Sequence, residues 1–278
     1  MGTNACYRMH LAVLGSSSAG NCTVVWNTSS SLLVDCGFPL PFIRRGLEGL
    51  GPGIPPLAGI LITHLHGDHV HPLTLEHFLT NAVPVYLSRR TCRLLRRRLP
   101  ALSLAGGRNL VNEAPATGIE VGTFEVSAFP VPHDAPGGCS GFSIRSGSGT
   151  ARRRLVIATD LGYVEDGLLE RFLDAHVIMI ESNHDPCMLE TSGRPAWLKR
   201  RIKEIGHLSN PQCADLVGAV MERSGRLPHT VVLAHISQEC NTAELAVETM
   251  RSHLHARGFL HAAVVPTHQY RTSEVVVV

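Results

Sequence analysis

The chain has 278 residues, a formal net charge of +2 and a hydrophobic fraction of 44%. A chain this apolar can bury enough surface to fold, so disorder is excluded over most of its length, and the small net charge excludes a large basic field. No apolar run approaches the roughly 20 residues that a membrane-spanning helix needs, so we expect no membrane association. We expect one domain over residues 1–278.

Cysteine usage and the N-terminus indicate the compartment. The first ten residues, MGTNACYRMH, contain no basic segment followed by an apolar one, so they do not resemble a secretion signal. The eight cysteines have no CxxC pair and no framework spacing. In a chain of this length such cysteines are expected to be reduced and mostly buried, which predicts a cytoplasmic protein.

Strands are predicted to outnumber helices in the first half of the chain. In chain order we expect strands at 8–14 and 22–35, a helix at 41–50, a strand at 59–63, a helix at 71–81, a strand at 83–87, a basic helix at 89–99 and strands within 119–131. The strand at 59–63 is a continuous apolar run between turn signals. The helix at 71–81 has proline at its start, where a missing N–H costs nothing.

Strands and helices alternate in the second half. We expect strands at 153–160 and 175–182, helices at 195–205 and 210–223, a strand at 230–235 and a helix at 243–258. This order predicts an α/β fold with sheets inside and helices outside. Three of the predicted strands end in a polar residue, in LITH, VIATD and VVLAH, and sites on layered folds are commonly built at the carboxyl ends of strands.

Residues 63–69, THLHGDH, follow a buried strand and carry three imidazoles and a carboxylate. These groups are the ligands of Zn(II), Mn(II) and Fe(II). On extended backbone His64 and His66 point to one side, and the following turn can bring Asp68 and His69 to a neighbouring position. The segment therefore offers ligands for two adjacent metal ions. The alternative is a histidine-rich surface loop, which leaves the density of ligands after a buried strand unexplained.

Three distant residues complete the candidate set. His133 follows a strand in VPHD, Asp160 ends LVIATD, and His235 ends VVLAH. Each residue alone is more often a structural strand-end residue than a ligand. Together with the four residues of THLHGDH they make seven, which is enough for two metal ions with open positions for water.

The pattern THxHxDH, with a later His, a later Asp after an apolar strand and a last His, resembles the metallo-β-lactamase superfamily. The resemblance implies a four-layer αββα sandwich with a dinuclear site at one edge of its two sheets. It assigns His64, His66 and His133 to one ion, Asp68, His69 and His235 to the other, and Asp160 to a bridging position. Asp35, in LLVDCG, matches a carboxylate that holds the site loops by hydrogen bonds.

Four further segments, GSSSAGN at 15–21, ESNHD at 181–185, GHLSN at 206–210 and LAHISQECN at 233–241, are similar to the YycJ/VicX (WalJ) branch. That resemblance implies a metal-dependent phosphodiesterase on nucleic acid, most specifically a 5′-to-3′ exonuclease on DNA. The reaction would be attack by water that two divalent ions activate, with Zn or Mn expected and Fe also compatible.

Three residues are expected to be catalytic: Asp68, His207 and Glu181. In related phosphodiesterases a His placed like His207 lies near the scissile phosphate and resembles a proton donor to the leaving oxygen, and a carboxylate placed like Glu181 orients it. The alternatives are a helix-start surface residue for His207 and a strand-end cap for Glu181.

Four residues are expected to contact the substrate: Ser17, Asn21, Asn183 and His184. The glycines and small hydroxyls of GSSSAGN could expose backbone N–H groups to a phosphate, although as a lone motif they equally describe a tight turn. The branch resemblance places Asn183 and His184 near the site without giving them a role.

Two basic segments are candidate nucleic-acid contacts. The Arg-rich segment 89–98 could lay a basic strip along phosphates, but a solvated amphipathic helix with Leu94, Leu95 and Leu99 buried explains it at least as well. The second group directly precedes His207 and is the better candidate. It consists of Arg194, Lys199, Arg200, Arg201 and Lys203.

Three alternatives compete with a nuclease. A hydrolase of a small ester, thioester, lactam or cyclic phosphodiester would use the same metal site. A redox di-iron relative would carry a carboxylate where this chain has His66, and a non-catalytic binding module would have lost ligands. The stretch from Asp160 to His235 is already filled by predicted elements, so we expect no inserted nucleic-acid-binding domain. Substrate grip would then come from loops of the core fold, from a dimer partner or from recruitment.

Overall fold

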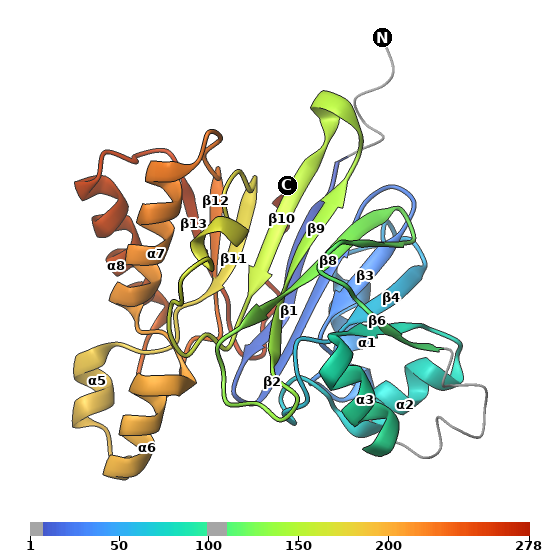
Figure 1. The fold of residues 1–278 in the computed structure, drawn as a ribbon, viewed down its shortest axis with the longest axis horizontal. Helices are drawn as coiled ribbons and strands as arrows, with labels where there is room; N and C mark the ends of the chain where they lie inside the picture. The colour runs from blue at the N-terminus through green and yellow to red at the C-terminus, as the bar shows by residue number, and fades with distance from the viewer. Residues whose placement is uncertain (1–7, 99–109) are drawn as a thin grey trace.

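Two seven-stranded sheets face each other in the computed structural model, which describes residues 8–98 and 110–278 (Figure 1). In spatial order the first sheet contains β14 (Val276–Val277), β1 (His10–Ser17), β2 (Gly20–Trp26), β3 (Ser31–Val34), β4 (Leu57–Leu61), β5 (Val85–Leu87) and β6 (Val111–Glu113). The second contains β13 (Ala263–Pro266), β12 (Thr230–Ala234), β11 (Val177–Glu181), β10 (Arg153–Ala158), β9 (Cys139–Ser146), β8 (Phe124–Val131) and β7 (Ile119–Val121).

Helices cover the outer face of each sheet (Figure 1). The first sheet is covered by α1 (Leu40–Gly49), α2 (Pro72–Thr80) and α3 (Arg89–Arg98), and the second by α7 (Asn210–Arg223) and α8 (Ala243–Ala256). Between β11 and α7 the chain forms α5 (Pro186–Thr191), α6 (Ala196–Arg201) and a π-helical turn (Ile202–Gly206). The layers follow the order helix, sheet, sheet, helix, which confirms the predicted αββα sandwich.

Each sheet is buried on both faces because three apolar clusters fill the spaces between the four layers. The cluster between the sheets contains the fully buried rings of Phe124 and Phe142. Every residue of β11 and β12 is buried. Strands that are covered on both sides read as continuous apolar runs, and this is why VIMIE and TVVLA were recognisable without alternation.

The predicted elements are mostly present, and the misses have local causes. The two short strands expected within 22–35 are β2 and β3, whereas the helix expected at 195–205 changes to π geometry at Ile202. The strands β6, β9, β13 and β14 and the helix α5 were not predicted. The C-terminal residue of the helix expected at 89–99 lies outside the described residues.

The missed strand β9 has the sequence CSGFSIRS, which is poor in strand-forming residues. It forms because β8 and β10 hydrogen-bond to it on both sides. Gly141 is required there, since a Cβ at this position would lie 2.4 Å from the ring of Phe129. Tertiary packing therefore overrides the local preference of this segment.

Among the described residues, no helix has the length and apolar character needed to cross a membrane.

Candidate metal centre and active site

The carboxyl ends of several strands meet at one edge of the two sheets. Strands β3 and β4 are parallel, as are β10, β11 and β12, so the residues that follow them emerge on the same side. The segments that follow these strands and β8 carry the candidate site residues Asp35, His64, His66, Asp68, His69, His133, Asp160, Glu181 and His235. The structure therefore brings together residues that lie up to 200 positions apart.

Three of these residues have left-handed backbone geometry. The φ angle is 61° at Asp35, 57° at Asp160 and 54° at His235. Residues other than glycine rarely adopt this region, and such strain collects at functional sites. At each position the turn comes directly or almost directly after a strand end and aims a polar side chain at the centre of the edge.

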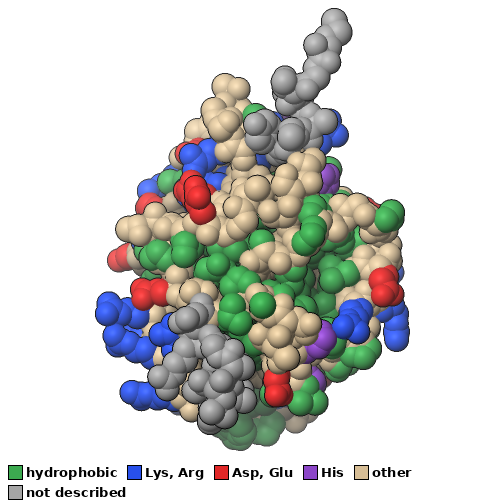
Figure 2. Space-filling model, turned by 90° about the vertical axis from the view of Figure 1, so that its right-hand side faces the viewer, with side chains coloured by type: hydrophobic (Ala, Val, Ile, Leu, Met, Phe, Trp, Pro, Cys, Tyr) green, Lys and Arg blue, Asp and Glu red, His purple; other side chains and the backbone are tan. Residues whose placement is uncertain are grey.

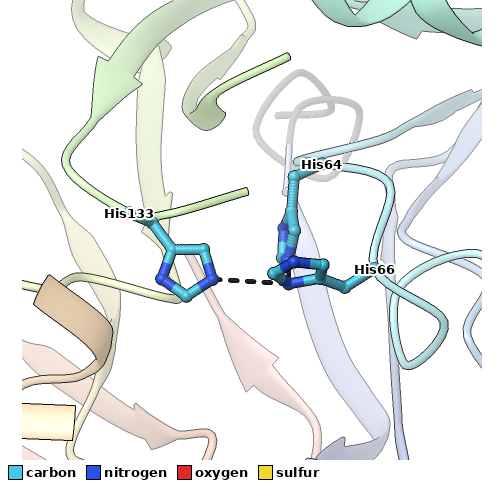
Figure 3. A group of neighbouring side chains, drawn as sticks. All are labelled: His64, His66 and His133. Carbon is cyan, nitrogen blue, oxygen red and sulfur yellow. Dashed lines mark hydrogen bonds between the residues drawn. The ribbon is translucent and has the colours of Figure 1, made fainter. Parts of the chain in front are cut away.

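The first group of candidate ligands consists of His64, His66 and His133. Figure 3 shows His133 approaching from the second sheet and the other two from the loop after β4. The His66 Nδ1 atom lies 2.9 Å from His64 Nε2 and 3.4 Å from His133 Nε2. Burial lowers the pKa of His64 and of His133, so both imidazoles favour the neutral form that a metal ligand must have.

The second group consists of Asp68, His69 and His235. The Asp68 Oδ2 atom lies 3.5 Å from His69 Nε2 and 3.6 Å from His235 Nε2. Burial raises the pKa of Asp68, but the neighbouring imidazoles of His235 and His69 outweigh it and hold the pKa below its usual range. The group therefore presents a carboxylate and two imidazoles to one point.

Asp160 lies between the two groups. Its Oδ2 atom is 3.0 Å from His69 Nε2, and its Oδ1 atom is 3.8 Å from His133 Nε2. Although burial raises the pKa of Asp160, the charges of His235 and His69 hold it well below the usual range. An ionised carboxylate in this position can reach both groups.

The donor set fits a pair of divalent ions. Asp160 Oδ2 and His235 Nε2 are buried and have no hydrogen-bond partner among the described residues. Buried polar atoms without partners are costly and call for an explanation such as an ion. Imidazole nitrogens and carboxylate oxygens are the ligands of zinc and manganese, so we propose these residues, with the two groups above, as the metal ligands.

Asp35 supports the second group from behind, as the sequence predicts. Its carboxylate accepts hydrogen bonds from the Thr63 N–H at 2.8 Å and from the Thr63 hydroxyl, and it lies 2.7 Å from His69 Nδ1. A carboxylate on Nδ1 fixes the ring so that Nε2 faces the centre.

The Asp35→Ala change should weaken metal retention by about 10- to 100-fold, because His69 would lose the partner that fixes its ring. It should also lower the melting temperature, since the buried His69 and Thr63 groups would be unpaired. Dialysis against graded chelator concentrations followed by metal analysis measures the first effect. Asp35→Asn, which keeps the shape, should retain more metal than Asp35→Ala; equal retention by wild type and both variants would contradict this role.

Gly37 allows the loop of THLHGDH to approach β3. A Cβ on Gly37 would lie 1.8 Å from the carbonyl oxygen of Asp68, and that oxygen also accepts a hydrogen bond from the Asn21 N–H at 2.7 Å. Gly37→Ala should therefore displace Asp68 and destabilise the fold by about 1–3 kcal/mol. Urea unfolding measures this, with Gly53→Ala as the matched control, since a Cβ there has nothing within 4 Å.

Glu181 connects two histidines and is fully buried. Its Oε1 atom lies 2.9 Å from His207 Nδ1 and 2.6 Å from His235 Nδ1, while Oε2 accepts hydrogen bonds from the Leu161 and Leu208 N–H groups. Burial raises the pKa of Glu181, but the charges and hydrogen bonds of the histidines lower it to about 2. Because no part of Glu181 is open to substrate, we assign it a positioning role for both rings. Orientation of His207 is the role that the resemblance implies, whereas the contact with His235 was not expected from the sequence.

A polar cavity of about 230 Å³ opens onto this edge. Its lining includes Asp68, His66, His207 and His235, so the candidate metal groups and His207 face the same space. A larger cavity of about 560 Å³ lies by α1, but its lining is mostly apolar and holds none of the candidate ligands. The polar cavity is therefore the candidate active site.

A family model described as a Beta-lactamase superfamily domain matches residues 30–236. The chain belongs to the beta-lactamase superfamily. It is 30% identical over 255 residues to "Exodeoxyribonuclease YycJ" of Bacillus anthracis, covering 90% of this chain and 91% of that one. It is also 30% identical over 245 residues to "Exodeoxyribonuclease WalJ" of Streptococcus pneumoniae strain D39, covering 87% of each chain.

The fold is shared with the metallo-beta-lactamase fold protein YhfI from Bacillus subtilis. The TM-score is 0.68 at 16% identity, with 98% of this chain and 100% of that chain covered. These findings confirm the predicted superfamily and the YycJ/WalJ branch. The family match, the hydrolase names of the relatives and the shared fold together identify the chain as a metal-dependent hydrolase.

Of the four residues that were expected to contact the substrate, one lines the cavity and three do not. Asn183 lines the cavity and its Nδ2 atom donates to the His235 carbonyl oxygen at 2.8 Å. Ser17, Asn21 and His184 are 2%, 6% and 2% exposed and are not among the lining residues, so the geometry argues against direct contact. The neighbour Ser18 does line the cavity.

The GSSSAGN motif forms a β-hairpin between β1 and β2, and several of its N–H groups already have partners. The Ser16 N–H donates to His268, and Asn21 Nδ2 lies 3.0 Å from His69 Nε2. Asn21 therefore braces the second ligand group, while Ser18, at the exposed turn of the hairpin, is the residue of the motif that lines the cavity. Cys139 was also missed by sequence reasoning; its Sγ atom lies 3.6 Å from His64 Nδ1, and no sequence signal distinguished it from the other cysteines.

The Arg-rich helix α3 packs as an amphipathic helix. Cys92 and Leu95 are buried against the first sheet, Leu94 is half-buried, and Leu99 lies outside the described residues. Figure 2 views the side of the molecule that carries α1–α3 in Figure 1; hydrophobic side chains occupy much of its middle, and Lys and Arg lie mainly toward its edges. The solvated-face interpretation is therefore favoured for α3.

Proposed function

We propose that this chain hydrolyses phosphodiester bonds in nucleic acid, and that its substrate is DNA degraded from the 5′ end. The observation that carries the proposal is His207 in the cavity, held at 2.9 Å by Glu181 beside the candidate metal groups. A nucleic-acid leaving oxygen is strongly basic and needs a proton as the P–O bond breaks, whereas a lactam or thioester hydrolase can work without such a pair. The names of the YycJ and WalJ relatives support the same reading.

The residues around the cavity have separate roles in the proposed reaction. When bound, two divalent ions, Zn(II), Mn(II) or Fe(II), would supply a water of near-neutral pKa and positive charge for the phosphate oxygens. Asp68, ionised and 20% exposed, can accept a hydrogen bond from the attacking water and orient it. His207 can hold a proton near the leaving oxygen, and Glu181 keeps its Nδ1 side engaged so that Nε2 faces the substrate.

An end-labelling assay tests this function. Protein loaded with Mn(II) or Zn(II) is incubated with 5′-labelled and 3′-labelled DNA and RNA, with His66→Ala as the control. We expect metal-dependent loss of the 5′ label from DNA as mononucleotides, absent in the variant. No cleavage of any polymer by protein that holds two metal ions would favour a hydrolase of a small ester, thioester or cyclic phosphodiester.

Several expectations remain proposals alongside this function. A single domain over residues 1–278, without an inserted nucleic-acid-binding domain, is one, and cytoplasmic location is another. Association into a dimer is left open by the sequence and is measured by sedimentation of the purified protein.

A further inference from the structure

The structure separates the five basic residues before His207 into two sets. Lys199 and Lys203 bind Glu190, and Arg200 pairs with Glu204 at 2.9 Å. None of these three side chains lines the active-site cavity, whereas Arg194 and Arg201 both do. Two arginines therefore face the same space as the candidate metal groups.

Each of the two arginines is held by one carboxylate. Arg201 donates from Nε and Nη2 to Asp134 at 2.6 and 2.9 Å, and Arg194 Nε donates to Glu239 at 2.9 Å. Their side chains keep 38% and 26% exposure. A guanidinium has five N–H donors, so each of these arginines keeps donors for an anion. The bond to the carboxylate fixes the direction in which its guanidinium points.

Trp197 lies on α6 one turn before Arg201 and is 68% exposed. Residues four apart on a helix are neighbours on its surface, so the spacing places Trp197 and Arg201 on the same side of α6. The other tryptophan, Trp26, is only 8% exposed. Leu198 and Arg201, which are neighbours of Trp197 on this helix, line the polar cavity, although Trp197 itself does not. An exposed large aromatic side chain on such a helix marks a contact surface, and its flat face suits a nucleobase.

We propose that α6 and the residues just before it bind the substrate strand beside the scissile phosphate, with Trp197 stacked on an unpaired base and Arg194 and Arg201 on adjacent phosphates. The inference rests on the proposed nucleic-acid substrate. A cavity of about 230 Å³ lies below the usual range for a ligand pocket, so the rest of a polymer must lie outside it, on the rim that α6 forms. Every base has a flat π-face, so stacking on Trp197 would hold a strand of any sequence.

Tryptophan fluorescence reports on this contact directly. In a Trp26→Phe background, Trp197 is the sole tryptophan of the chain. The protein carries Zn(II) and His207→Ala, which slows cleavage, and is titrated with single-stranded oligothymidylate. We expect saturable quenching of the emission. Anisotropy of a labelled oligonucleotide should show binding weakened about tenfold by Trp197→Ala and largely retained by Trp197→Phe.

Salt dependence tests the arginines with a neighbouring control. Arg201→Ala should reduce the slope of log K against log salt by about 0.7 for a single strand, because one phosphate contact is lost. Arg200→Ala, on the next residue of the same helix, should leave the slope unchanged. Equal slopes for the two variants would overturn the assignment of Arg201, since a purely structural ion pair with Asp134 predicts no difference.

The outcomes separate this inference from the proposed function. Cleavage of DNA without quenching, and with Trp197→Ala binding as wild type, overturns the α6 surface and leaves the nuclease standing. Quenching with the expected slope change but no cleavage of any nucleic acid supports the α6 surface and removes the nuclease.

Discussion

Asp160→Ala is expected to lose bound metal and hydrolytic activity together, with turnover at least about 10³-fold lower. The carboxylate of Asp160 lies between the two candidate ligand groups, 3.0 Å from His69 Nε2 and 3.5 Å from His235 Nδ1. It is 1% exposed, and Oδ2 has no hydrogen-bond partner among the described residues. Its removal would leave a cluster of imidazoles without the central anion that offsets the positive charge of the metal ions.

Backbone strain must be separated from the loss of the ligand. Asp160 has a φ of 57°, a region that alanine adopts less readily than aspartate or asparagine. Asp160→Asn keeps the shape and tolerates the backbone, so it should fold normally and still lose most metal and activity. Asp166→Ala, at an exposed carboxylate six residues later, is the control and should behave as wild type.

Metal content and turnover are measured on the same preparations. The ligand role would be contradicted if Asp160→Ala and Asp160→Asn both held two ions per chain and worked within about tenfold of wild type. His66→Ala should repeat the result of Asp160→Ala from the first ligand group.

His207→Ala should lower turnover on DNA by about 10²- to 10⁴-fold, the usual worth of a positioned acid. Its side chain is 16% exposed in the cavity, and Glu181 holds it at 2.9 Å. The loss should depend on the leaving group. With bis(p-nitrophenyl) phosphate the leaving oxygen is stable without a proton, so His207→Ala should cost less than about tenfold there.

Comparison of the two substrates distinguishes proton donation by His207 from its other possible roles. His261→Ala removes an exposed histidine and should change neither rate. Equal losses on both substrates, with metal retained, would remove the acid role and leave His207 as a phosphate-binding group. Glu181→Gln should reduce metal content as well as turnover on DNA, because Glu181 also holds His235 at 2.6 Å.

The candidate ligands could be predicted because most of the information is local. THLHGDH places four of them within six residues after a buried apolar strand, and VIATD and VVLAH end buried strands in the same way. Parallel strands deliver their carboxyl ends to one edge, so three distant segments could be expected to meet. The alternation of strands and helices predicted that sheets lie inside and helices outside. The arrangement of the strands in two facing sheets was implied by the family resemblance.

Features that depend on tertiary contacts could not be read from the sequence. Strand β9 has weak strand propensity and forms because it lies between β8 and β10. The sequence suggested that Glu181 orients His207, but its shorter contact with His235 appears only when β11 and β12 lie side by side. Ser17 and His184 lie near the site in sequence motifs, yet both side chains are covered by neighbouring segments.

The basic segment before His207 is a further feature that the sequence alone could not resolve. Its five basic residues look alike in sequence, and only the helix α6 and the π-helical turn after it decide which ones face the cavity. The turn also presents the Gly206 carbonyl oxygen 2.9 Å from His133 Nδ1, which leaves His133 Nε2 directed at the first ligand group. π-helical turns are rare and cannot be recognised from residue pattern alone.

Titration of metal-depleted protein with Mn(II), with cleavage of DNA followed at each addition, tests the central claim most directly. The account predicts no cleavage without metal and a rise in rate that reaches its plateau at two equivalents per chain. Cleavage of DNA at an undiminished rate by protein shown to be free of metal would contradict it.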